Sequence, residues 1–75
     1  MAEGFVHTVH RDGRWMNSIE GDQDPLPDSF DTKQDAVEAG RAEARQRQTE
    51  HVIHNEDGSF GERHSYGNDP ADRPG

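Results

Sequence analysis

The sequence predicts an α+β domain of order ββαββ, in which a single helix separates two antiparallel hairpins and packs on one face of their sheet. Two Asp-Gly turns, Asp12-Gly13 and Asp57-Gly58, each stand between β-branched and aromatic residues, and this pattern is typical of hairpins. The residues around the turns also repeat, since both read His, one residue, Val or Ile, His, turn, aromatic. The two hairpins can join into one four-stranded sheet.

The first hairpin is expected over residues 5–11 and 14–20, with Asp12-Gly13 as a two-residue turn. In this register His10 lies opposite Trp15, and directly opposed residues of an antiparallel pair share a face. We expect the face that carries the only tryptophan to line the core. That face consists of Val6, Thr8, His10, Trp15, Asn17 and Ile19.

Two segments are expected to lack regular structure. Residues 21–29 read as a solvated acidic connection, because two prolines exclude a central strand, although a short edge strand is compatible with the sequence around Leu26. Residues 71–75 read as a flexible C-terminal tail. Residues 1–70 therefore form a single small α+β domain in this interpretation.

The helix is predicted from Lys33 to about Gln48. Thr32 is a natural N-cap, with an acidic residue three positions later. The small residues Ala36, Gly40 and Ala44 recur every four positions. They form a narrow stripe that allows the helix to approach a sheet closely.

The second hairpin is expected over residues 51–55 and 59–65. Its turn is one residue longer than the first, which suits a left-handed Gly58. His54 then opposes Phe60 as His10 opposes Trp15. We expect both histidine–aromatic pairs on the same face, with both aromatic rings in the core.

Composition favours self-association. The chain has 75 residues, only ten of them Leu, Ile, Val or Phe, and a net charge of −8. A domain this small usually needs an additional constraint, and without cysteine it cannot form a disulfide. A homodimer is the least demanding alternative, and no cofactor is expected.

The charge and the apolar pattern restrict location and partners. An acidic surface repels phosphate backbones over most of its area, which disfavours nucleic acid. The N-terminus lacks the basic and apolar runs of a signal peptide, and no stretch approaches the ~18 apolar residues of a membrane helix. We therefore expect a cytoplasmic protein that makes no membrane contact.

Several short motifs together resemble a known family. They are His7, Val9, Asp12-Gly13, Trp15, Asp31-Thr32-Lys33, Ala36, His54, Asp57-Gly58 and the run Ser65-Tyr66-Gly67-Asn68-Asp69-Pro70. With them the sequence resembles bacterial proteins of the domain-of-unknown-function 2188 family over roughly residues 7–70. It departs from the family pattern at Asn17 and His51, where apolar residues are usual. The resemblance implies a small cytoplasmic bacterial domain and implies no activity.

Five histidines invite a metal-binding interpretation. The two His-x-x-His spacings do not support it on their own, because residues three apart on a strand point to opposite faces. A metal site would need His10 and His54 brought together from the two hairpins, plus a third ligand. We take these two as weak candidates and expect no metal.

No set of residues predicts catalysis. The serines lie in no Gly-x-Ser-x-Gly turn, and a chain this short can hardly enclose a pocket. Nucleic-acid binding is the alternative, through an exposed sheet face or through Arg41, Arg45 and Arg47 on the helix. The sequence favours a non-catalytic, self-associating interaction or structural module.

Overall fold

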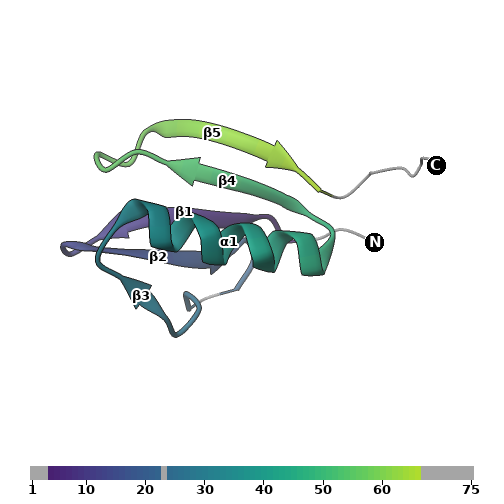
Figure 1. Cartoon of the computed structure of the whole chain (residues 1–75), viewed down its shortest axis with the longest axis horizontal. Helices are drawn as coiled ribbons and strands as arrows, with labels where there is room; N and C mark the ends of the chain where they lie inside the picture. The colour runs from purple at the N-terminus through teal and green to yellow at the C-terminus, as the bar shows by residue number, and fades with distance from the viewer. Residues whose placement is uncertain (1–3, 23, 67–75) are drawn as a thin grey trace.

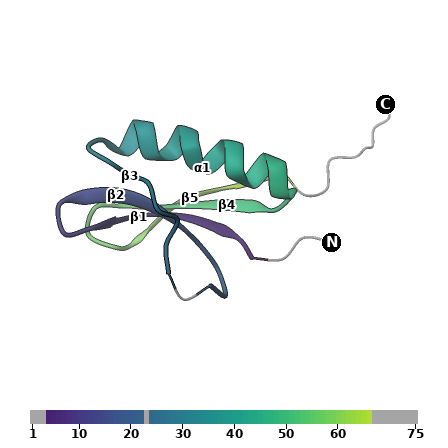
Figure 2. The ribbon, with the colours of Figure 1, turned by 90° about the horizontal axis from the view of Figure 1, so that it is seen from below.

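The computed structural model describes residues 4–22 and 24–66 and confirms the α+β fold, with one helix packed on a five-stranded mixed sheet. The elements are β1 (Val6–Arg11), β2 (Arg14–Ile19), β3 (Ser29–Phe30), α1 (Lys33–Arg47), β4 (Glu50–His54) and β5 (Phe60–Ser65). The strands lie in the order β3-β2-β1-β4-β5, and α1 crosses one face of the sheet (Figures 1 and 2). The predicted tail, residues 71–75, lies outside the described residues.

The first hairpin has the predicted register. His10 pairs with Trp15 and Arg11 with Arg14 across the turn. The predicted core face is the one beneath α1, where Trp15 is 8% exposed and Thr8 is fully buried. His10 is half-buried, with its ring centroid 4.9 Å from that of Trp15.

The edge strand after the first hairpin lies later than Leu26. β3 pairs with β2 through Trp15↔Phe30 and Met16↔Ser29. Leu26 makes one bond to β2, from its N–H to the carbonyl of Asn17 at 2.9 Å. The prolines on either side of Leu26 have no N–H, which leaves no donor on the side turned away from β2 and restricts this segment to the edge of the sheet.

The helix begins and packs as predicted. The Thr32 hydroxyl accepts a hydrogen bond from the Asp35 N–H at 3.2 Å. The three small residues Ala36, Gly40 and Ala44 are the buried ones. Gln48 ends the helix in the left-handed conformation, with φ 56°.

The second hairpin pairs as predicted but faces the other way. His54 pairs with Phe60, whereas β4 joins β1 in parallel with Val6 beside His51. His51 repeats His7 in the sequence, so the register is one residue away from the repeat. A one-residue offset sends every repeated side chain to the opposite face.

The prediction that both aromatic rings lie in the core is therefore wrong. Trp15 lies beneath α1, whereas Phe60 is 63% exposed and is the one large hydrophobic residue exposed among the described residues. Paired residues of neighbouring strands point to the same face, so the register between β1 and β4 decides this outcome. Nothing within either hairpin encodes that register.

Candidate functional site

The sheet face turned away from α1, called the open face below, is the candidate functional surface. In Figure 2 the helix lies on one side of the sheet only, and the connection between β2 and β3 dips to the other side at one edge. Strand alternation places five apolar side chains on the open face. They are Phe5, Val9, Met16, Val52 and Phe60, of which Val52 is only 6% exposed and Phe60 is 63% exposed.

Three of these apolar side chains, together with His54, form a row across the sheet. Met16 pairs with Val9, and the β1–β4 register continued by one residue puts His54 beside Val9. Phe60 then pairs with His54 at the outer strand. The row crosses four strands and ends at the exposed ring of Phe60.

The charges of the open face are close to balance, although the chain carries −8. Alternation places Arg11 and Arg14 at the end nearest the first turn and Glu20 and Glu50 at the opposite end. Arg63 lies between them, with its Nε 3.2 Å from Glu50 Oε1. Beyond these strand residues, the connection between β2 and β3, which dips to this side at one edge, carries the exposed residues Asp22, Asp24 and Asp28.

A histidine pair occupies the middle of the open face. His7 Nδ1 lies 2.9 Å from His54 Nε2, and the two rings are stacked with centroids 5.2 Å apart. On its other side, His7 Nε2 lies 3.3 Å from Glu20 Oε1. Burial lowers the pKa of His54 from its usual value, and the nearby His7 lowers it further.

The carboxylate fixes the protonation pattern of this pair. An ionised carboxylate can only accept hydrogen bonds, so His7 Nε2–H donates to Glu20. In a neutral His7 the Nδ1 atom is then the acceptor, and His54 Nε2–H donates to it. The chain of contacts therefore runs His54 to His7 to Glu20.

The structure does not bring the sequence-predicted candidates His10 and His54 together. His10 packs against Trp15 on the helix-covered face, and His54 contacts His7 on the open face. Among residues 4–22 and 24–66 no group of three or more histidines and acids could hold a metal ion. Sequence reasoning found His54 but missed His7, because only the parallel β1–β4 register brings them together.

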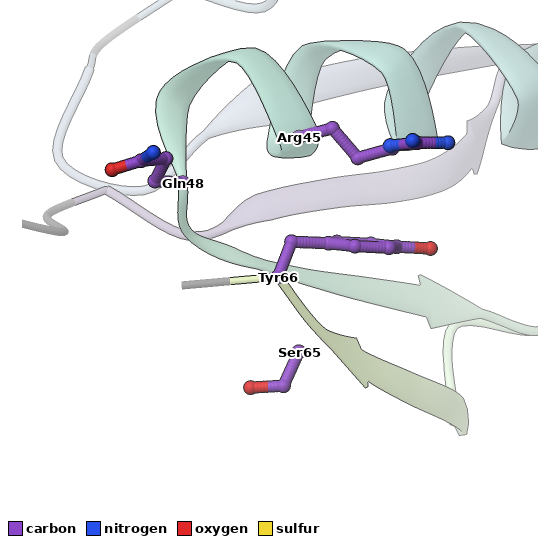
Figure 3. Close-up of a pocket in the computed structure, with 4 residues that line it drawn as sticks. All are labelled: Arg45, Gln48, Ser65 and Tyr66. Carbon is purple, nitrogen blue, oxygen red and sulfur yellow. The ribbon is translucent and has the colours of Figure 1, made fainter. Parts of the chain in front are cut away.

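The helix arginines do not join the open face. Arg41, Arg45 and Arg47 lie on α1, on the other side of the sheet, and all three are exposed. The Nε of Arg47 bonds to Glu43. Arg45 instead lines an open pocket of about 360 Å³ with Gln48, Ser65 and Tyr66, and its side chain runs alongside the Tyr66 ring (Figure 3).

A buried polar cluster lies beneath Gly40 on the helix-covered face. The Thr8 hydroxyl donates to Asn17 Oδ1 at 2.5 Å, and the Asn17 amide donates to the carbonyl of Ala36 at 3.0 Å. The single hydroxyl proton is thereby used, so the 2.6 Å contact with His51 needs His51 Nε2–H as donor.

His51 in this cluster is held neutral. Its side chain is 1% exposed. Burial is the main reason that its pKa falls to about 4, with smaller contributions from the charges of His64, Arg41 and His7. A substrate cannot reach this group, so we assign the cluster to the core.

Comparison with known proteins gives one match. The family model described as "Uncharacterized protein conserved in bacteria (DUF2188)" matches residues 6–66. No curated protein matches the chain, and no solved structure does. In the part of the chain that the structure describes, the helix is too short and too polar to cross a membrane.

Proposed function

We propose that this chain, which belongs to the DUF2188 family of bacterial proteins, is a non-catalytic cytoplasmic interaction module that forms a homodimer through its open face. The observation that carries the proposal is Phe60, which is 63% exposed at the end of an apolar row on a face without a helix. Exposed apolar patches mark interaction surfaces, and burial is worth roughly 25 cal/mol per Å² of apolar area.

The charges of the open face favour a second copy as its occupant. The strands contribute three arginines and two glutamates to this face, so two copies meet there with less repulsion than a net charge of −8 would produce. A two-fold axis perpendicular to the strands would place the arginine end of one copy over the glutamate end of the other. The same face offers little to a polyanion.

Pairing at a sheet edge is the less favoured route to a dimer. One edge is β3, which has only two residues. The other is β5, which carries Glu62, Arg63 and His64 and has a bulge opposite Ile53 and His54. Short strands, charges and bulges are features that oppose edge pairing.

Light scattering over a concentration series tests the proposal. The wild-type chain is expected to have the mass of a dimer, and Phe60→Asp is expected to have that of a monomer. An exposed side chain contributes little to the fold, so the variant should remain folded by circular dichroism. Gln34→Asp, which adds the same charge in the first turn of α1, is the matched control and should remain dimeric. A folded wild-type monomer at micromolar concentration would contradict the proposal.

Nucleic-acid binding is the second candidate, and the exposed Phe60 ring on a sheet face is the observation that favours it. Fluorescence anisotropy with a single-stranded oligonucleotide tests it. Binding at low salt that weakens as salt rises, and that is lost in Phe60→Ala, would support it. The alternative is that binding is retained in Phe60→Ala and lost when Arg41, Arg45 and Arg47 are all replaced by alanine. That result would place the oligonucleotide on the helix.

A further inference from the structure

We propose that His7 and His54 form a two-ligand site for a divalent transition-metal cation of the Zn²⁺, Ni²⁺ or Cu²⁺ class, with Glu20 as the positioning residue. The ligand atoms are His7 Nδ1 and His54 Nε2. Imidazole nitrogen suits these three cations better than it suits Mg²⁺ or Ca²⁺. The site goes beyond the proposed dimer and does not depend on it, because both ligands belong to one chain.

The separation of the two nitrogens fits a shared ion. They lie 2.9 Å apart. Zinc–imidazole bonds of about 2.0–2.1 Å at a tetrahedral angle place two nitrogens about 3.3 Å apart. The rings therefore need to move apart by about half an ångström and to turn so that both lone pairs point at the ion, and both rings are partly exposed.

Glu20 prepares His7 to act as a ligand. Metal-binding histidines usually donate their second N–H to a carboxylate, which fixes the tautomer and raises ligand basicity. Glu20 Oε1 lies 3.3 Å from His7 Nε2, so the lone pair is left on Nδ1, the atom that faces His54. The tautomer that His7 needs as a ligand is therefore present before the ion.

His54 needs one change of tautomer. Its Nε2 proton, which is donated to His7, must leave that atom before a metal can bind there. The proton moves to Nδ1 of the same ring by exchange with water, so a neutral imidazole remains and no net proton is released.

The protein supplies two of the four positions that a tetrahedral ion uses. The described residues add no third ligand at this place. Water can fill the remaining positions, so the expected affinity is that of an open site. In a single chain an ion bound here is exposed on the open face, and in the proposed dimer it lies at the interface.

Calorimetric titration of the full chain with ZnCl₂ and with NiCl₂ tests the site. One ion per chain is expected, and His7→Ala and His54→Ala should each abolish binding. His64→Ala is the matched control, because His64 is a strand histidine that bonds to Glu62 at 3.0 Å on the edge strand, and it should bind as the wild type does. Glu20→Ala should weaken binding by roughly 10- to 100-fold.

Nitrogen NMR of the histidine rings separates this role from a structural one. In the metal-free chain His54 should be the Nε2–H tautomer, and added Zn²⁺ should convert it to Nδ1–H while shifting His7 Nδ1. Met16→Asp places a charge on the open face and is designed to prevent dimerisation. Its affinity for Zn²⁺ should equal that of the wild type, whether or not the wild type forms a dimer. Absence of binding, retention of binding in both His7→Ala and His54→Ala, or loss of binding in His64→Ala would overturn the proposal.

Discussion

Gly40 is the residue on which close contact between helix and sheet depends. A Cβ at this position would lie 2.5 Å from Asn17 Oδ1, 2.6 Å from His51 Nε2 and 2.9 Å from Thr8 Oγ1. Thr8 Oγ1 is hydrogen-bonded to each of the other two atoms. The three cannot move apart without breaking those bonds. The stripe of small residues was visible in the sequence, but the polar cluster beneath it was not.

Gly40→Ala is expected to destabilise the fold by up to about 2 kcal/mol. Alanine gains about 1 kcal/mol of helix propensity over glycine, but forcing a methyl group into a packed site costs roughly 1–3 kcal/mol. Urea unfolding measures the difference. Ala42→Gly, at an exposed position of the same helix, should lose about 1 kcal/mol through propensity alone. A stabilised Gly40→Ala chain would contradict the packing described here.

His51 is expected to make stability depend on pH. The folded pKa is about 4 and the unfolded value 6.5, so the unfolded chain binds the proton more readily. The contribution of neutral His51 to the free energy of unfolding is fully present above pH 6.5. It is lost as pH falls toward 4, which lowers the free energy of unfolding by about 3 kcal/mol. Urea unfolding at several pH values measures this slope.

His51→Val is the matching control for that slope. Valine is apolar and β-branched, which suits a buried strand position, and in the variant Thr8 still donates to Asn17. The carboxylates titrate in both chains. The difference in the free energy of unfolding between wild type and variant from pH 6.5 to pH 4 therefore reports the titration of His51 alone. A slope that His51→Val leaves unchanged would show that His51 is not the group responsible.

At the scale of the elements, the extent of α1 was predictable from the sequence, and the left-handed conformation of its C-cap was not. The cap at Thr32 and the buried alanines follow from spacings within one turn or two of the chain. The left-handed Gln48 has no such signal, since glycine or asparagine is usual at this place. Its N–H bonds to the carbonyls of Ala44 and Arg45, which hold the last turn closed.

Gln48→Gly is expected to stabilise the fold by about 0.5–1 kcal/mol. Glycine adopts a positive φ without the steric cost that a side chain carries, and the hydrogen bonds of the cap use only backbone atoms. Thermal unfolding measures the gain. Gln46→Gly, inside the helix, should instead lose about 1 kcal/mol. Equal losses in both variants would argue against the left-handed cap.

The strands show the same division between local and distant information. The pairing of Val6 with Ile19 and of His54 with Phe60 follows from turns that lie within the hairpins. The parallel contact of β1 with β4 joins residues more than forty positions apart, such as Val6 and His51. That register was not encoded in either hairpin, and it decided which face Phe60 and His54 occupy.

At the scale of the whole molecule, one helix covers one side of a sheet whose other side carries the apolar row and the histidine pair (Figure 2). The repeat in the sequence predicted two equivalent hairpins, but the register inverts the second. Each face consequently receives one histidine–aromatic pair, His10–Trp15 on the covered face and His54–Phe60 on the open face. Self-association is the expected consequence of the exposed pair.

Intermolecular NMR contacts in a mixed sample of isotope-labelled and unlabelled chains test the central claim most directly. We predict contacts between protomers that involve the open face. The residues concerned are Phe5, Val9, Met16, Val52 and Phe60. Contacts confined to α1 or to the backbone of β5, or a sample with no contacts and the mass of one chain, would contradict it.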